Sequence, residues 1–388
     1  MPARPVVPDA RYGERLAKAQ ALLAKGGVRA ALVGVGADLH YLTGYVAMPL
    51  ERLTMLVLPA AGEPVIVAPR LEAMMAAECA AARSGRVVVQ AWDETDDAHA
   101  LVAALLAARG GRVRAGDRVL LSDRLWAMHV LGLGRALPGA DFGLGSEVLG
   151  ELRMIKDADE IALLRLAAQA ADRVVAQIAA GRLVGRTERE VSAEVRERLL
   201  AEGHDVAEFA IVASGPNSAS PHHDAGDRVI RAGEPIVLDI GGTVDGYCSD
   251  TTRTLWVTGG DPANGPSAEF QRLFDVLVDA QAEASSAVRP GVPCERIDAV
   301  ARGIIAGGGH GPDFIHRVGH GIGLETHEDP YMVAGNAEPL RSGMAFSVEP
   351  GIYLAGRHGA RIEDIVICGP AGPDVLNESS RDLWVVPG

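Results

Sequence analysis

The stretch VLDIGGTVDGYCSDTTRT, from Val237 to Thr254, decides the fold around the candidate site. At its centre Asp245-Gly246 is a strong signal for a two-residue hairpin turn between two strands. Counting outward from that turn sets Asp239 opposite Thr252, with Asp250 on the diagonal. Opposed residues, and alternate residues along a strand, share one face of a sheet. The sequence therefore predicts that both carboxylates and the threonine hydroxyl lie on one face.

Three further motifs carry candidate ligands: HRVGHGIGLETHEDP (316–330) with His320, FSVEPGIY (346–353) with Glu349, and GARIEDIVI (359–367) with Glu363. Acids inside apolar strands need a partner when they are buried. Two unscreened carboxylates ~4 Å apart repel by roughly 4 kcal/mol at an effective dielectric of 20, so a cluster of four requires cations. Oxygen-rich ligation with one nitrogen favours hard divalent ions, and paired ions are a known device for amide hydrolysis. The sequence thus predicts a dinuclear metallohydrolase.

Two neighbours of these acids are expected to orient them. Arg361 alternates with Ile362, so it shares a face with Glu363 and is expected to orient that carboxylate. The Thr252 hydroxyl is expected to be a hydrogen-bonding partner of the ligands. Glu349 and Glu363 would form a second acidic pair across the turn-rich loop Gly351–Gly359.

Composition limits the class of protein. A chain of 388 residues exceeds the size at which one core stops growing, so two domains are expected. The formal net charge is −14 and no basic stripe is present, which disfavours nucleic-acid binding. No run approaches the ~20 apolar residues that span a bilayer. The four cysteines form no CxxC pair, and the first residues lack the apolar core of a signal peptide, so we expect a cytoplasmic protein.

The two halves of the chain differ in pattern. Residues 1–153 alternate short apolar runs with Ala/Leu-rich helical segments, which indicates an α/β domain containing a hairpin at 53–68. Helices are expected at Leu71–Ala82, over the long stretch Glu151–Gly181 that joins the domains, and at Thr187–Glu202. The last of these opens with the capping box of Thr187 and Glu190. Further helices are expected at 270–288 and 293–305, and strands at 235–242, 252–258, 344–350 and 360–368.

The motifs resemble a known family. The second half is similar to the pita-bread metallopeptidases: prolidase, aminopeptidase P and methionine aminopeptidase. The first half, with DLHYLTGY (38–45) and ERLTMLVLPAAG (51–62), looks like the N-terminal domain of prolidases, aminopeptidase P and creatinase. The resemblance implies a creatinase-like α/β N-terminal domain, 1–153, and an α+β pita-bread catalytic domain, 154–388. It also implies a homodimer.

The resemblance assigns ligands to two divalent ions, Mn²⁺ first and Co²⁺ or Zn²⁺ as alternatives. Asp239 would chelate one ion, Asp250 and Glu363 would bridge both, and His320 and Glu349 would complete the second. The large N-terminal domain disfavours methionine aminopeptidase, and the complete ligand set disfavours creatinase-type chemistry.

Other residues match active-site positions of the family. His222, in SPHHDAG (220–226), would lie near the scissile bond, while His223 beside it faces away. His327 would steady the tetrahedral intermediate, and Glu349 would move the proton. The remaining expected site residues are Arg361 in catalysis and His316, Tyr331, Tyr353 and Arg52 in substrate binding.

The implied activity is that of an Xaa-Pro dipeptidase, in which a metal-bridging hydroxide attacks the amide before a C-terminal proline. Its substrates would be proline-containing dipeptides or short peptides. An Xaa-Pro aminopeptidase acting on longer peptides is the first alternative, and a metal-free binding module of the same fold is the second.

One departure concerns the substrate's free carboxylate. Many prolidases carry an arginine directly after HE-x-P to grip it, whereas here HEDP is followed by Tyr331. Arg52 is the first candidate for that role, if a partner subunit covers the site. Arg317 and Arg357 are the other candidates.

Overall fold

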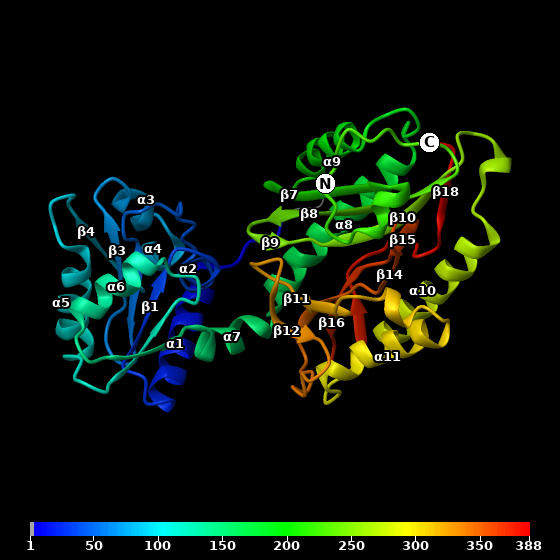
Figure 1. Ribbon diagram of the computed structural model, residues 1–388. Coiled ribbons are helices and arrows are strands. Elements are labelled where there is room, and N and C mark those ends of the chain that lie inside the picture. The colour runs from blue at the N-terminus through cyan, green and yellow to red at the C-terminus, as the bar shows by residue number, and fades with distance from the viewer. Residues whose placement is uncertain (1–3) are drawn as a thin grey trace. The chain divides into compact units, whose positions relative to one another are not determined.

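The computed structural model describes residues 4–388 and divides into two compact units. One is Val6–Arg153, and the other is Met154–Gly388 together with residues 4 and 5 (Figure 1). Within the described residues, no helix is both long and apolar enough to span a membrane.

The N-terminal unit is built on a six-stranded sheet with the strand order β4-β3-β2-β1-β5-β6. The β2–β3 hairpin is antiparallel, as the sequence predicted, while β1–β5, β5–β6 and β3–β4 run parallel. The strands are β1 Ala30–Gly34, β2 Met55–Pro59, β3 Val65–Pro69, β4 Val88–Trp92, β5 Arg118–Leu121 and β6 Asp141–Leu144.

Helices pack against this sheet, which confirms the α/β class of the unit. Val102 and Leu106 of one helix and Leu133 of another are buried against β1, β2 and β5. The helices are α1 Asp9–Lys25, α2 Ala37–Thr43, α3 Ala73–Ala77, α4 Ala80–Arg83, α5 Ala98–Gly110, α6 Ala127–Ala136 and α7 Ser146–Met154.

The C-terminal unit contains two five-stranded sheets, each packed on its own pair of helices, and one two-stranded sheet. The first has the order β18-β10-β8-β7, with the short β9 paired to β8, and shares a core with α8 and α9. Its elements are β7 Val206–Ser214, β8 Glu234–Val244, β9 Tyr247–Cys248, β10 Thr251–Val257, β18 Trp384–Val386, α8 Ala158–Ala179 and α9 Glu188–Ala201.

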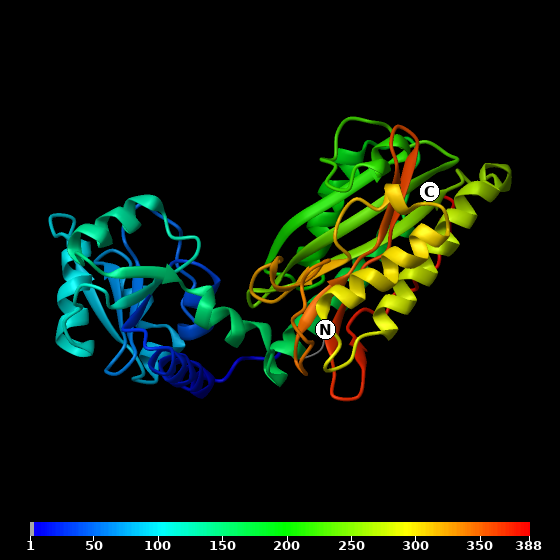
Figure 2. The same ribbon diagram turned by 60° about the horizontal axis from the view of Figure 1, so that its bottom comes forward.

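The second sheet has the order β12-β11-β13-β16-β17 and packs on α10 and α11, which lie side by side in both views (Figures 1 and 2). Its strands are β11 Gly319–Gly321, β12 Glu328–Met332, β13 Ala345–Val348, β16 Asp364–Cys368 and β17 Pro373–Val375. The helices are α10 Ala268–Ser286 and α11 Cys294–Gly307, and β14 Gly351–Leu354 pairs with β15 His358–Arg361. Two α+β halves of this kind are the expected pita-bread architecture.

Three predicted elements are divided in the structure. The helix expected over Leu71–Ala82 is the two short helices α3 and α4, since residues 78 and 79 are not helical. The helix expected over Glu151–Gly181 breaks at residues 155–157, where Ile155 pairs with Met344 and Asp157 caps a new helix with Glu160. The strand expected over 360–368 divides into β15 and β16, which leaves Glu363 between them. The predicted capping box of Thr187 and Glu190 is present.

Candidate metal centre

The β8–β10 hairpin has the predicted register. Asp239 on β8 is paired with Thr252 on β10, and on its other side with Ile211 on β7. Asp250 directly precedes β10, and its carboxylate and that of Asp239 line the same cavity. The local turn therefore brings two acids, eleven positions apart in sequence, to one wall.

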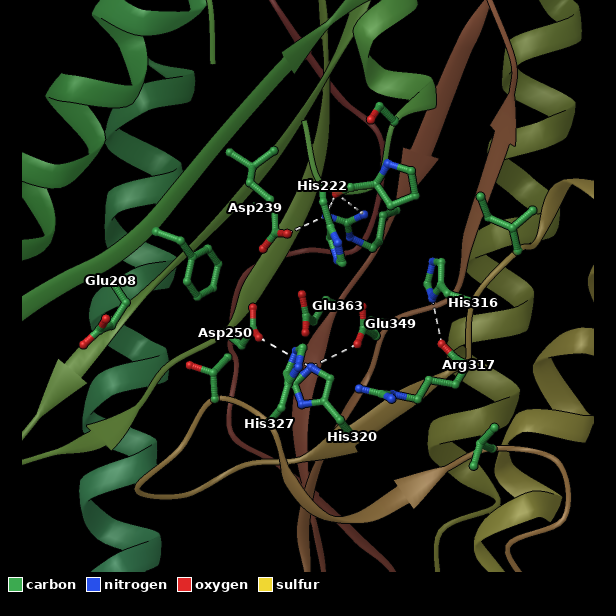
Figure 3. Close-up of a pocket in the computed structure, with 18 residues that line it drawn as sticks. Glu208, His222, Asp239, Asp250, His316, Arg317, His320, His327, Glu349 and Glu363 are labelled. Carbon is green, nitrogen blue, oxygen red and sulfur yellow. Dashed lines mark hydrogen bonds and ion pairs between the residues drawn. The ribbon is translucent and has the colours of Figure 1, made fainter. Parts of the chain in front are cut away.

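The cavity has a volume of about 950 Å³ and lies within the C-terminal unit (Figure 3). Segments far apart in the chain supply its polar lining. Of the expected site residues, the following line it: His222, Asp239, Asp250, His316, His320, His327, Glu349, Arg361 and Glu363.

His320 lies between the carboxylates. Donor atoms of Asp250, His320 and Glu363 lie within 4.8 Å of one another, and His320 Nε2 is 3.1 Å from Glu349 Oε1. The Nδ1 atom of His320 is 3.1 Å from the carbonyl oxygen of Gly321, which can only accept, so Nδ1 carries the hydrogen. In the neutral ring Nε2 then points its lone pair at a carboxylate oxygen. A cation between these two atoms, or a proton on Nε2, would make that contact favourable.

Two oxygens of the cluster have no protein partner. Asp239 Oδ1 and Glu363 Oε1 are buried and make no hydrogen bond within residues 4–388. A buried polar atom left unsatisfied costs about 1–3 kcal/mol, more when it is charged. Oxygen donors of this kind, gathered with one imidazole, fit a pair of hard divalent cations. The residues present thus fit the metal ions that the sequence predicted.

Arg361 holds Asp239 rather than Glu363. Its Nη2 lies 2.5 Å from Asp239 Oδ2, while Nε donates to Thr252 Oγ1 at 3.1 Å. Thr252 Oγ1 in turn donates to Glu363 Oε2 at 2.8 Å. Arg361 is predicted to orient Glu363, and the structure connects the two side chains only through the Thr252 hydroxyl, which lies between them. The predicted role of the Thr252 hydroxyl agrees with this geometry.

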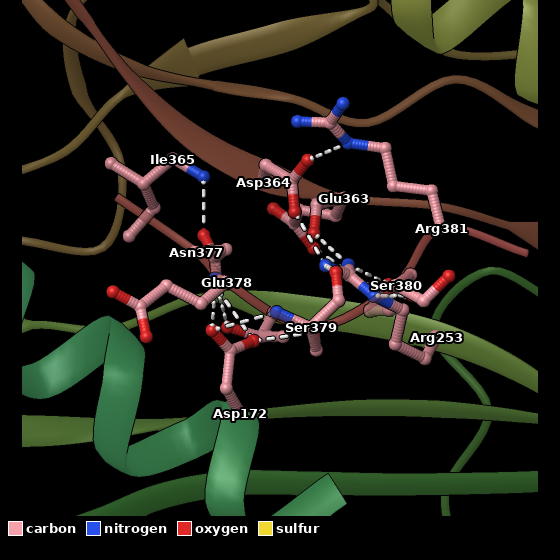
Figure 4. A network of polar contacts seen from close by, with 12 residues as sticks. Asp172, Arg253, Glu363, Asp364, Ile365, Asn377, Glu378, Ser379, Ser380 and Arg381 are labelled. Atoms are coloured by element: carbon pink, nitrogen blue, oxygen red, sulfur yellow. Dashed lines mark hydrogen bonds and ion pairs between the residues drawn. The ribbon is translucent and has the colours of Figure 1, made fainter. Parts of the chain in front are cut away.

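A buried network of ion pairs and hydrogen bonds contacts the backbone of Glu363 (Figure 4). Arg253, only 1% exposed, donates to the Glu363 carbonyl at 2.6 Å and to Asp364 Oδ1 at 2.7 Å. The second carboxylate oxygen of Asp364 accepts from Gln281 and Arg381. Arg253 thus anchors both the backbone of Glu363 and the side chain of the next residue, Asp364.

The pKa values of the cluster residues are shifted in opposite directions. Burial, and then the neighbouring carboxylates, raise the pKa of Asp250 and of Glu363 well above its ordinary value. Burial would also raise the pKa of Glu349, but the hydrogen bond and charge of His320, with the charges of His316 and Arg361, lower it to about 2. Burial lowers the pKa of His327 to about 4, so this ring is neutral at neutral pH.

His222 and His223 have different surroundings. His222 lines the cavity, while His223 Nε2 lies 2.7 Å from Glu188 Oε2, as expected for a side chain facing away. Glu188 is fully buried and also accepts hydrogen bonds from Ser214 and Asn217. This acid therefore holds the loop that carries His222.

The expected substrate-binding residues are not all in the cavity wall. Tyr353 is buried behind it, where its hydroxyl meets Arg361 Nη1 at 2.8 Å and His316 Nε2 at 2.9 Å. Tyr331 pairs with His320 across β11 and β12, outside the lining. Arg52 lies in the N-terminal unit, where Glu72, Glu51 and Glu94 surround its guanidinium.

Several lining residues were missed from the sequence. Phe209 and Ile211 of β7, with Ile315 and Val333, give the cavity an apolar part, and Glu208 lies at its edge. Ile211 could have been found only by knowing that β7 pairs with β8 opposite Asp239, because nothing in its own sequence neighbourhood marks it.

The raised pKa values give a prediction for the metal-free protein. A carboxyl whose pKa is higher in the folded chain holds its proton more tightly there, so folding is favoured at low pH and stability is lost as pH rises through the folded pKa. This applies to Asp250, Glu363 and Asp239, because burial raises the pKa of all three. The pKa of Glu349 is lowered to about 2, so this group affects stability only in more acidic solution. Divalent cations need the ionised carboxylates. We expect the melting temperature with Mn²⁺ minus that with a chelator to grow between about pH 5 and pH 8.

The measurement is thermal unfolding across that pH range, with Asp250→Asn as a comparison that removes one titrating group. A melting-temperature gap that stayed constant or narrowed with rising pH would contradict the assignment of these acids as ligands.

Comparison with known proteins yields two family matches. The model of metallopeptidase family M24 matches residues 162–370, and that of the creatinase/prolidase N-terminal domain matches residues 15–155. Together they cover most of both units.

Individual relatives match over nearly their whole length. A probable dipeptidase PepE of Mycobacterium tuberculosis is 46% identical over 377 residues, 97% of each chain. The crystal structure of dipeptidase PepE from Mycobacterium ulcerans has a TM-score of 0.90 at 45% identity, covering 98% of this chain and 99% of that one. A recombinant prolidase from Thermococcus sibiricus gives 0.88 at 36% identity, covering 97% and 99%.

Proposed function

The chain belongs to metallopeptidase family M24, and on that premise we propose that it is a dinuclear-metal Xaa-Pro dipeptidase, a prolidase. The observation that carries this proposal is the cluster of four carboxylates and His320 on one cavity, with two buried carboxylate oxygens lacking partners. The solved relative from Thermococcus sibiricus is described as a prolidase, which supports the choice of substrate.

The ligands proposed for two divalent cations are Asp239, Asp250, His320, Glu349 and Glu363. Bound there, the cations would supply Lewis-acid activation of a water molecule and of the amide carbonyl. Mn²⁺ is the first expectation for their identity, with Co²⁺ and Zn²⁺ as alternatives, because oxygen-rich sites suit hard ions and availability in the cell decides among them.

Glu349 is proposed to move the proton. Glu349 lines the cavity beside His320, so its carboxylate would accept a proton from the attacking water and pass it to the leaving proline nitrogen. That nitrogen must be protonated for the C–N bond to break. Ser347 Oγ donates to Glu349 Oε1 at 3.1 Å and orients the carboxylate.

The histidines of the cavity wall are proposed to handle the carbonyl oxygen and the peptide. His327 is neutral at neutral pH, so one ring N–H can donate to the oxygen as negative charge develops on it. Its ring centroid is 4.0 Å from that of His320, beside the cluster. His222 faces the same cavity and would contact the scissile bond. His316, Tyr353 and Arg361 form a hydrogen-bonded chain that positions Arg361 on Asp239.

A panel of peptides tests the proposal. With Mn²⁺ present, we expect Ala-Pro to be hydrolysed with a kcat/KM at least about tenfold above those for Ala-Ala and Ala-Pro-Ala, because one tenfold step needs only about 1.4 kcal/mol of differential binding. Preference for Ala-Pro-Ala would instead identify an Xaa-Pro aminopeptidase. A folded protein without any peptidase activity under Mn²⁺, Co²⁺ or Zn²⁺ would favour the metal-free binding module.

Two further proposals concern the setting of the enzyme. A cytoplasmic location is supported by four free, buried cysteines that form no disulfide. A homodimer is proposed from the family resemblance, and sedimentation of the purified protein would measure it.

A further inference from the structure

Arg317 is a charged side chain of the cavity wall that the proposed mechanism does not use. It lines the cavity, half-buried, and within residues 4–388 it makes no ion pair with an acidic side chain. Arg361, the other arginine of the lining, is 2% exposed and bound to Asp239. The cavity therefore contains one guanidinium that is already neutralised and one that is not.

The side chain of Arg317 stacks on an aromatic ring, and the backbone of the residues before and after it is hydrogen-bonded. Its guanidinium carbon lies 4.4 Å from the centre of the Tyr331 ring, so the planar group is stacked on an aromatic face. Arg302 donates to the carbonyl of the preceding residue, His316, at 2.7 Å. The amide of the following residue, Val318, donates to Asp298 at 2.9 Å, and Asp298 also anchors Arg302. The guanidinium N–H groups of Arg317 are directed toward the cavity, and no described acidic side chain is paired with them (Figure 3). They are therefore available to bind an anionic group of a substrate.

Charge is distributed unevenly around the metal ligands. Figure 3 shows Arg317 and Glu208 on opposite sides of the carboxylate cluster. A dipeptide is a zwitterion whose ammonium and carboxylate flank a single amide bond. With that bond over the cluster, a dipeptide whose carboxylate faced Arg317 would have its ammonium on the side of Glu208.

We propose that Arg317, stacked on Tyr331, binds the free carboxylate of the dipeptide substrate and thereby sets its length. A guanidinium matches a carboxylate with two parallel hydrogen bonds, a geometry that a lysine cannot reproduce. The inference rests on the proposed dipeptidase function. Tyr331 follows HEDP, at the position where many prolidases have an arginine. In this proposal its ring instead packs against Arg317, which lies fourteen residues earlier in the chain.

A double comparison tests this. The enzyme with Mn²⁺ is assayed on Ala-Pro and on Ala-Pro amide, which lacks the negative charge, for the wild type and for Arg317→Gln. We expect Arg317→Gln to raise the KM for Ala-Pro at least about tenfold with kcat changed less than about threefold, since uniform binding is lost. The wild type should prefer the free acid over the amide by a similar factor, and the variant should lose that preference.

Matched variants distinguish an effect of the Arg317 charge from an effect on folding and from the effect of other arginines. Arg317→Lys keeps the charge but loses the paired donors, so an intermediate KM with an unchanged melting temperature is expected even if Arg317→Gln folds poorly. Arg357→Gln removes an exposed arginine that pairs with Glu269 outside the cavity, and should leave both KM values unchanged. Arg52→Gln tests the competing candidate in the N-terminal unit.

An Arg317→Gln enzyme that retained the wild-type KM and acid preference would overturn the assignment, as would loss of the preference in Arg52→Gln alone. Failure of the proposed function looks different. A wild type that cleaves Ala-Ala better than Ala-Pro would remove the proline preference, and Arg317 would then be judged by the same comparison on Ala-Ala and its amide.

Discussion

Replacing Asp250 by alanine is expected to lower kcat/KM for Ala-Pro by at least about 10³-fold, even with excess Mn²⁺. Donor atoms of Asp250, His320 and Glu363 lie within 4.8 Å of one another, so Asp250 is proposed to be one of the residues that would hold the cations. Metal polarisation of the reacting groups is worth several kcal/mol of transition-state stabilisation, and each 1.36 kcal/mol is a factor of ten in rate. Steady-state kinetics with Mn²⁺ in excess measure the effect.

Asp245→Asn is the matched control for this substitution. Asp245 is in the same hairpin, with a φ of 52°, a left-handed conformation that asparagine also adopts. It does not line the cavity, so activity should stay within about twofold, the scatter usual for surface changes. An Asp250→Ala enzyme retaining more than a tenth of the wild-type rate would be incompatible with a ligand role.

Replacing Arg361 by methionine is expected to reduce the free energy of unfolding of the metal-free protein by about 3–5 kcal/mol, because one partner of a buried ion pair is left alone. Arg361 is 2% exposed and bonds Asp239, Thr252, Tyr353 and the carbonyl of Pro221. Pro221 precedes His222, so the same change should also loosen the loop that carries His222 and lower the activity.

Denaturant titration in the presence of a chelator measures this loss. Arg361→Lys, which keeps the charge but not the forked donors, should lose less stability. Arg357→Met, in the turn of the same β14–β15 hairpin, removes an exposed pair and should cost no more than about 0.5 kcal/mol. A loss below about 1 kcal/mol for Arg361→Met would mean that Asp239 is stabilised without it.

The features that could be predicted from sequence are mostly local. The Asp245-Gly246 turn fixes its own register, so the pairing of Asp239 with Thr252 followed from counting. The capping box of Thr187 and Glu190 spans four consecutive residues, so it too could be read from the local sequence. The family resemblance, carried by short motifs around the ligands, is confirmed by the matches to both family models.

The errors arose where local pattern and tertiary contacts disagree. Helical periodicity continues through residues 155–157, but Ile155 pairs with Met344 and Asp157 starts a new helix. The spacing Asp157-x-x-Glu160 is a capping signal that could have been read. Arg361 and Glu363 do alternate, yet Glu363 leaves the strand to pair with Thr252 of the other sheet. Neither that bridge nor the support from Arg253 has a local sequence signature, because both join segments about 110 residues apart.

The central claim is that the carboxylate cluster binds two divalent cations. Titration of chelator-treated protein with Mn²⁺ by calorimetry, with elemental analysis of the dialysed complex, tests it most directly. We predict two Mn²⁺ per folded chain for the wild type and for Asp245→Asn, and at most one for Asp250→Ala. A folded wild-type chain that bound no divalent cation, or bound the same number after loss of Asp250, would contradict the account.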